Sequence, residues 1–190
     1  MGKGRLEAFS DGVIAIIITI MVLELKVPHG HELRDLLPMA PIFGAHVLSF
    51  LYVAIYWNNH HHLFQAVHKV NGQVLWANMH LLFWLSLIPF MSGWLGEGGF
   101  KTMPIVFYGV VLLMAGVAYY FLVHALIAHH GHDSKIAVAI GADYKGTVSL
   151  VVYAAGIAIA FFAPIAAFLL YAAVALVWFI PDKRIERVVS

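Results

Sequence analysis

The chain has 190 residues, of which 62% are hydrophobic and 11% are charged, with a formal net charge of +1 and no cysteine. A soluble domain of this size carries about 25% charged residues, so this composition excludes a soluble fold, which would expose most of the apolar side chains to water. The lack of cysteine excludes disulfides, thiolate metal sites and cysteine nucleophiles. The small net charge comes with no basic patch, so nothing indicates nucleic-acid binding.

Long apolar runs recur along the chain, as is typical of membrane spans. The first run, residues 13–23, is followed by no small-residue cleavage site, which favours a retained span over a signal peptide. Residues 147–163 and 165–180 are short for spans, and only Pro164 separates them, which predicts a tight hairpin. The sequence therefore predicts an all-α, polytopic membrane protein with one domain over residues 1–190 and six transmembrane helices, at 5–27, 39–67, 73–94, 104–128, 147–163 and 165–180.

The distribution of basic residues predicts the orientation of the chain in the membrane. With six spans, both termini and the second and fourth loops share one side. The opposite side holds three basic residues, Lys26, Arg34 and Lys101. The shared side holds the other eight of the eleven: Lys3, Arg5, Lys69, Lys135, Lys145, Lys183, Arg184 and Arg187. The excess of basic residues predicts that both termini are cytoplasmic.

The first predicted helix has two distinct faces. Ile16, Thr19, Ile20 and Leu23 occupy positions i, i+3, i+4 and i+7 and therefore form one stripe. Asp11 lies about 140° around the helix from Ile16, so it faces a different environment. From the residues alone, the stripe could face lipid or pack against another helix, and Asp11 could be a structural carboxylate held by hydrogen bonds.

A motif opens this helix: Arg5, then three residues, then Phe9, Ser10 and Asp11, with Thr19 eight residues beyond the aspartate. The motif resembles the transmembrane protein 175 family, the endolysosomal potassium channels and their bacterial homologues. The resemblance extends over the whole chain, through the six spans, the cytoplasmic termini and the second-helix segment 56–61, Tyr-Trp-Asn-Asn-His-His.

The resemblance implies a potassium-selective cation channel rather than an enzyme. A single six-helix unit looks like the bacterial form, which implies a homotetramer in the plasma membrane with its pore lined by the first helix of each subunit. Its partners would be membrane lipid and potassium ions, with K⁺ as the permeant ion and no cofactor. The pore constriction would consist of Ile16, Thr19, Ile20 and Leu23.

The sequence contains no TVGYG filter loop, so selectivity would depend on side chains and gating on dewetting of an apolar ring. Polar groups within a span need partners, and we expect them to fix the first helix to its own subunit. The predicted structural polar network consists of Arg5, Phe9, Ser10, Asp11, Trp57, Asn58, His61 and His80.

Two alternatives to a channel remain. The run His124, His129, His130 resembles the histidine boxes of membrane di-iron enzymes, and these residues are also weak candidates for loose metal binding. With His132, the pair His129 and His130 could instead tune gating by pH. A secondary transporter would need broken helices and inverted repeats, but apart from Pro89 the central spans look continuous.

Overall fold

The computed structural model describes residues 2–131, 133–141 and 143–179, which fold into helices joined by short connections. The one β-type contact among these residues is an isolated antiparallel bridge between Gly2 and Lys69. The helices are α1 (Gly4–Leu23), η1 (Leu33–Met39, a 3₁₀ helix), α2 (Ala40–Gln65), α3 (Gly72–Ser86), α4 (Ile88–Glu97), α5 (Thr102–His130), α6 (Lys135–Ile140), α7 (Tyr144–Ala160) and α8 (Pro164–Phe179).

Four helical segments in the described residues are long and apolar enough to cross a membrane. They are α1, the continuous segment from η1 through α2, the segment from α3 through α4, and α5. Helices α7 and α8 are also apolar but have only 17 and 16 residues. The prediction of an all-helical membrane protein is therefore confirmed, whereas η1 and α6 were not predicted from the sequence.

The predicted third span, 73–94, is two helices rather than one. Helix α3 ends at Ser86 and α4 begins at Ile88, with Leu87 between them. Pro89 explains the break, because proline has no amide hydrogen to donate and its ring clashes with the carbonyl group four residues earlier. The first helix also ends earlier than predicted, at Leu23 rather than at residue 27.

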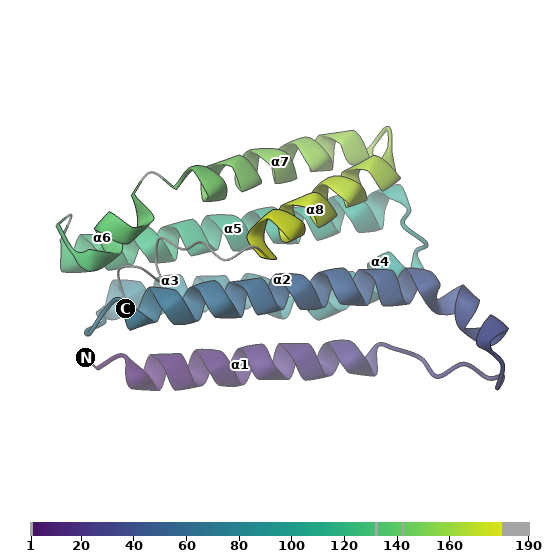
Figure 1. Cartoon of the computed structure of the whole chain (residues 1–190), viewed down its shortest axis with the longest axis horizontal. Helices are drawn as coiled ribbons and strands as arrows, with labels where there is room; N and C mark the ends of the chain where they lie inside the picture. The colour runs from purple at the N-terminus through teal and green to yellow at the C-terminus, as the bar shows by residue number, and fades with distance from the viewer. Residues whose placement is uncertain (1, 132, 142, 180–190) are drawn as a thin grey trace.

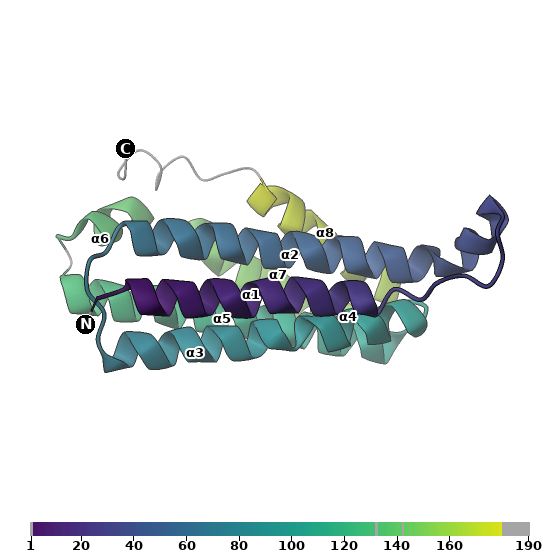
Figure 2. The same ribbon diagram turned by 90° about the horizontal axis from the view of Figure 1, so that it is seen from below.

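The helices run roughly along one direction, with α1 at the edge of the bundle (Figures 1 and 2). Helix α1 packs against α2, α3 and α4, whereas α5 packs against α3, α4, α7 and α8. The N-terminus, the α2–α3 turn and α6 lie at one end of the bundle, and η1 and the α4–α5 and α7–α8 turns lie at the other (Figure 1). Of the basic residues assigned to the cytoplasmic side, Lys183, Arg184 and Arg187 lie outside the described residues.

Two glycines let α8 approach α5 and α7 closely. A Cβ atom on Gly109 of α5 would lie 2.1 Å from the Tyr171 hydroxyl, and one on Gly156 of α7 would lie 2.4 Å from the Tyr171 ring. Small residues permit this close packing of membrane helices. Tyr171 is buried, and its backbone carbonyl accepts a 2.7 Å hydrogen bond from the Tyr52 hydroxyl of α2. These contacts join α2, α5, α7 and α8.

Candidate functional site

Helix α1 buries one face within its own chain and exposes the other. The exposed face carries the predicted constriction, with Ile16, Ile20 and Leu23 exposed by 57%, 43% and 81%. The Thr19 side chain is also exposed, and its hydroxyl donates a 2.8 Å hydrogen bond to the Ile16 carbonyl of the same helix. The buried face consists of Leu6, Ser10, Ile14, Ile17 and Met21.

An apolar groove runs beside the exposed stripe, between α1 and the junction of α3 and α4. Ile16 and Ile20 contribute to one wall, and Pro89 and Phe90 contribute to the other. Because the break at Leu87 places Pro89 and Phe90 here, the kink between α3 and α4 shapes the surface beside the stripe.

A buried chain of hydrogen bonds ties α1 to α2 and α3. The Asn78 amide of α3 donates to the Ser10 hydroxyl at 2.9 Å, and its carbonyl oxygen lies 2.8 Å from Nε2 of His60 on α2. Ser10 in turn donates to the Leu6 carbonyl at 2.8 Å. The Asn78 side chain can therefore satisfy Ser10 and His60 at once, and all three are buried.

A second polar contact lies on the exposed flank of α1. The Trp57 indole N–H of α2 donates to the Asp11 carboxylate at 3.0 Å, and the Trp57 ring stacks on His61 with a centroid separation of 5.7 Å. The Nε2 atom of the His61 ring lies 2.8 Å from the side-chain amide nitrogen of Gln65. Asp11, Trp57 and His61 are all exposed in the single chain.

The remaining members of the predicted network do not join these two groups. Arg5 and Phe9 are exposed, and Arg5 forms no ion pair within the described part of the chain. Asn58 is half-buried beside Trp57 and forms no side-chain hydrogen bond with a described residue. The residues predicted to form one network therefore form two separate groups of contacts, and Arg5, Phe9 and Asn58 belong to neither group.

His80 lies elsewhere, which corrects its predicted association with Asp11. Its Nε2 accepts a 3.0 Å hydrogen bond from the Trp84 indole, and its ring stacks on Phe121 of α5 at 6.2 Å. At 100° per residue His80 lies about 160° around α3 from Asn78, the residue that does face α1. Asn78 itself was missed from the sequence, although a single asparagine inside the apolar segment 72–86 was a usable signal.

The predicted histidine box does not assemble into a metal site. His129 and His130 lie about 140° and 120° away from His124 on opposite sides of α5, so the three fan out around the helix. Nδ1 of His124 lies 2.9 Å from the Tyr120 carbonyl, and Nδ1 of His129 lies 3.2 Å from the Asn71 amide nitrogen. Among the described residues, no group of three or more histidine or acidic side chains is placed to hold a metal ion. His132 lies outside the described residues.

The opposite end of α1 carries a different set of charges. Lys26 pairs with Glu97 at the end of α4, and the hydrogen bond and charge of Glu97 raise the pKa of Lys26 above its ordinary value. The Glu24 carboxylate lies close to Gly93 of α4, where a Cβ atom would meet it at 3.1 Å. These contacts place the segment that follows α1 beside α4, and the Lys26–Glu97 pair is exposed.

Comparison with known proteins agrees with this arrangement. The family model described as Endosomal/lysosomal potassium channel TMEM175 matches residues 5–89, a region that contains both polar contacts of α1. A potassium channel of Chryseobacterium sp. strain P1-3 is 56% identical over 187 residues, which cover 98% of this chain and 97% of the relative. A potassium channel of Streptomyces collinus is 38% identical over 99 residues, or 50% of this chain and 48% of the relative.

A solved structure has the same fold. The crystal structure of a lysosomal potassium-selective channel TMEM175 homolog from Chamaesiphon minutus matches with a TM-score of 0.79 and 27% sequence identity. The match covers 93% of this chain and 96% of that chain. The likeness therefore extends well beyond the region matched by the family model and includes α5, α7 and α8.

Proposed function

This chain belongs to the family of the endosomal/lysosomal potassium channel TMEM175, and from that membership we propose that it forms a potassium-selective cation channel. It is a multi-pass membrane protein of a channel family, not an enzyme. We propose further that residues 1–190 act as one domain with six spans, α7 and α8 being the two short ones. Both termini would be cytoplasmic, in the plasma membrane, and four copies would surround the pore.

The observation that carries this proposal is the position of Asp11 on the exposed side of α1. Asp11 lies seven residues beyond Gly4, about 10 Å along the helix. A carboxylate at that depth is costly against lipid, and such residues face protein or water instead. Among the described residues Asp11 has one hydrogen-bond donor, Trp57, and it remains exposed. This supports a position against a neighbouring subunit or a water-filled path rather than against acyl chains.

The exposed stripe supplies the proposed constriction. One helix cannot enclose a path, so four copies of α1 would bring Ile16 together around a central axis, with Thr19, Ile20 and Leu23 farther toward the outer side. A narrow apolar ring excludes water when closed. When the ring is open, an ion would have to shed part of its hydration shell, which favours K⁺ because it holds water less tightly than Na⁺. Thr19 hydroxyls would replace some of the lost water ligands, and no filter loop would be required.

The buried face of α1 would then hold the pore helix at a fixed position. Asn78 bonds to Ser10 and lies beside His60, so α1, α2 and α3 share one polar contact. The association of Asp11 with Trp57 adds a second contact nearer the stripe. These groups are proposed to support the pore without touching the ion.

A liposome flux assay of the purified protein tests the proposal. Under opposing potassium and sodium gradients we expect passive flux that favours potassium. Ile16→Asn should wet the constriction and lower the ratio of potassium to sodium permeability. Ile165→Asn is the matched control, because Ile165 of α8 is also exposed, by 55%, but lies outside α1. Strict exchange stoichiometry would indicate a transporter, and an unchanged ratio in Ile16→Asn would remove Ile16 from the filter.

A further inference from the structure

An open groove lies at the end of the bundle opposite the N-terminus, where the α4–α5 and α7–α8 turns lie (Figure 1). Two segments long and apolar enough to cross a membrane, Gly72–Glu97 and Thr102–His130, meet at the first of these turns, so the groove lies near the membrane surface. Its volume is about 680 Å³, and sites for small ligands measure about 300–1,000 Å³. The groove, here called the rim groove, is lined by Trp94, Gly98, residues 101–104 and Pro164.

The polar side chains of the rim groove are hydrogen-bond donors without partners. They are the Lys101 ammonium group, the Trp94 indole N–H and the Thr102 hydroxyl, and none of them bonds to a described residue. Among the described residues, no carboxylate lines the groove. A ligand that uses these groups must therefore accept hydrogen bonds, and the charge of Lys101 favours an anion.

Lys101 is also the one lysine or arginine at this end of the described chain that forms no ion pair. Lys26 pairs with Glu97, and Arg34 pairs with Glu32. The charge of Lys101 is therefore left to a partner from outside the described chain.

The turn before α5 holds the backbone at Lys101 in a fixed position. Gly99 and Phe100 both have positive φ angles, of 61° and 58°. This conformation is strained for a bulky residue such as phenylalanine, and it persists only where the surrounding structure holds it. The Phe100 ring packs on Phe168 of α8, with the ring centroids 4.6 Å apart. This packing fixes the backbone that immediately precedes Lys101.

Exposed apolar side chains continue from the rim groove toward the middle of the membrane. Met103 is exposed by 51%, and Phe107, one helical turn farther along α5, is exposed by 48%. The Trp94 ring lies 5.6 Å from the Phe107 ring and 6.4 Å from the ring of Phe90, which is one turn deeper on α4. The bundle therefore presents donors near the membrane surface and apolar groups below them, which is the order of the headgroup and the acyl chains in a phospholipid.

We propose that the rim groove binds an anionic phospholipid, with the phosphate at Lys101 and an acyl chain along Trp94 and Phe107. Basic residues at a membrane surface attract anionic lipids. A zwitterionic lipid also brings an ammonium group, which would find no carboxylate among the described residues of the groove. The nearby acid Glu97 lines a separate pocket and is already paired with Lys26.

A second copy of this chain fits the rim groove less well than a lipid does, because it would need a free acid for Lys101. Of the four acids at this end of the described chain, Glu32 and Glu97 are ion-paired. Asp35 accepts a hydrogen bond from the Glu32 amide. The fourth, Glu24, lines the groove beside the stripe of α1. A tetramer around α1 would therefore place Glu24 near the pore and not against the rim groove.

Native mass spectrometry of the purified full-length protein in detergent, titrated with dioleoyl phosphatidylglycerol or dioleoyl phosphatidylcholine, tests this proposal. We expect phosphatidylglycerol to bind more tightly. Lys101→Gln should lower the affinity for phosphatidylglycerol about fivefold, the effect of one basic residue near a membrane surface, and should leave the affinity for phosphatidylcholine unchanged. Lys101→Arg keeps the charge and should keep the preference. Arg34→Gln is the matched control, because Arg34 is an exposed basic residue at the same end, outside the groove and paired with Glu32, and this variant should bind both lipids as the unchanged protein does.

A soluble competitor separates the lipid from its headgroup alone. Glycerol 3-phosphate carries the negative charge without acyl chains and should not displace phosphatidylglycerol. The proposal is overturned if it does so at equal concentration, if both lipids bind alike, or if Lys101→Gln binds phosphatidylglycerol as the unchanged protein does. It is also overturned if Arg34→Gln weakens binding as much as Lys101→Gln, or if no lipid binds because a neighbouring copy covers the groove. Since no described residue of α1 lines the rim groove, each of these results leaves the flux assay of the channel independent.

Discussion

Replacing Asn78 with leucine should break the buried contact that joins α1, α2 and α3. The Asn78 side chain is fully buried, with 0% exposure, and its two polar atoms bond to Ser10 and lie beside His60. Leucine has a similar volume and fills the space, so the substitution removes hydrogen bonds without creating a large cavity. The predicted effect is therefore a loss of polar partners rather than of packing.

The size of the effect follows from which partners are left unpaired. Ser10 keeps its hydrogen bond to the Leu6 carbonyl, so it loses little. His60 loses the partner of its Nε2 atom in a buried position, and an unpaired buried polar group costs about 1–3 kcal/mol. Hydrogen bonds between membrane helices average about 0.6 kcal/mol. We therefore expect the free energy of unfolding to fall by about 2 kcal/mol, most of it from His60.

Unfolding in mixed micelles of increasing sodium dodecyl sulfate content, followed by circular dichroism, measures this free energy. Ser86→Ala is the control on the same helix, because Ser86 is exposed and, within the described part of the chain, its hydroxyl bonds only to the Phe83 carbonyl. This substitution should cost less than about 0.5 kcal/mol. Adding His60→Leu to Asn78→Leu should cost less than the sum of the two single changes, since it removes the unpaired group. Strict additivity, or a cost for Asn78→Leu no larger than that of Ser86→Ala, would refute the reasoning.

Two further substitutions test the exposed flank of α1 and the close packing around Tyr171. Asp11→Ala removes the acceptor of the Trp57 indole N–H. We expect light scattering to show a smaller fraction of tetramer, and the channels that do assemble to keep their ratio of potassium to sodium permeability. A stable tetramer with an altered ion preference would contradict this expectation. Gly109→Ala places a Cβ atom 2.1 Å from the Tyr171 hydroxyl and should lower stability by about 1–3 kcal/mol in the same unfolding assay. Gly72→Ala, with no atom within 4 Å of the added methyl group, is its control, and an equal cost in both would contradict the packing argument.

The apolar pattern of the sequence was enough to predict the membrane helices but not their interruptions. The length of the runs predicted helices close to α2, α5, α7 and α8, because burial in lipid demands continuous helical hydrogen bonding. Pro89 was visible in the sequence, yet whether it bends a helix or divides it depends on the packing of the neighbouring helices. The 3₁₀ turn of η1 and the short α6 depend on local capping, such as the Ser134 side chain accepting from the Ala137 amide, which apolar periodicity does not report.

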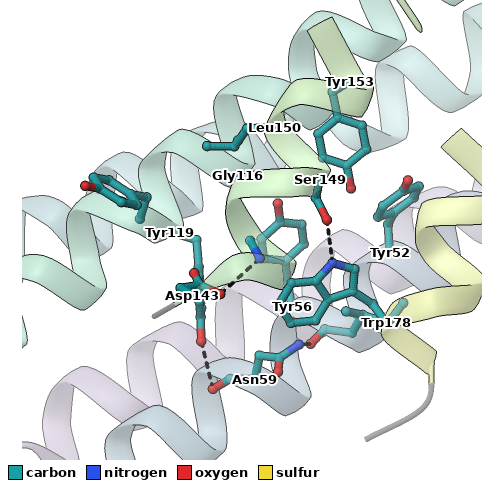
Figure 3. Close-up of a pocket in the computed structure, with 13 residues that line it drawn as sticks. Tyr52, Tyr56, Asn59, Gly116, Tyr119, Asp143, Ser149, Leu150, Tyr153 and Trp178 are labelled. Atoms are coloured by element: carbon teal, nitrogen blue, oxygen red, sulfur yellow. Dashed lines mark hydrogen bonds between the residues drawn. The ribbon is translucent and has the colours of Figure 1, made fainter. Parts of the chain in front are cut away.

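The polar contacts show where sequence reasoning about sites ends. A helical wheel separates Asp11 from Ile16, and the structure likewise exposes them on different parts of α1. The wheel gives no information about which residue of another helix contacts Ser10. His80 was therefore predicted as the residue of α3 in the polar network, whereas Asn78 is the residue that bonds to Ser10. A cavity lined by Tyr52, Tyr119 and Trp178 among other residues was missed for the same reason, because its lining comes from four helices that only tertiary packing brings together (Figure 3).

The division of α1 into two faces suggests why its polar residues are placed as they are. In a membrane, apolar contact between helices brings little net gain over contact with lipid, so packing shape and hydrogen bonds must fix the position of a helix. The contact of Ser10 with Asn78 and His60 holds α1 from its buried side. The stripe of Ile16 lies on the other, exposed side of α1 and takes no part in that contact. A pore built this way could vary its constriction without loss of the fold, since the residues that anchor the helix are not those that would meet the ion.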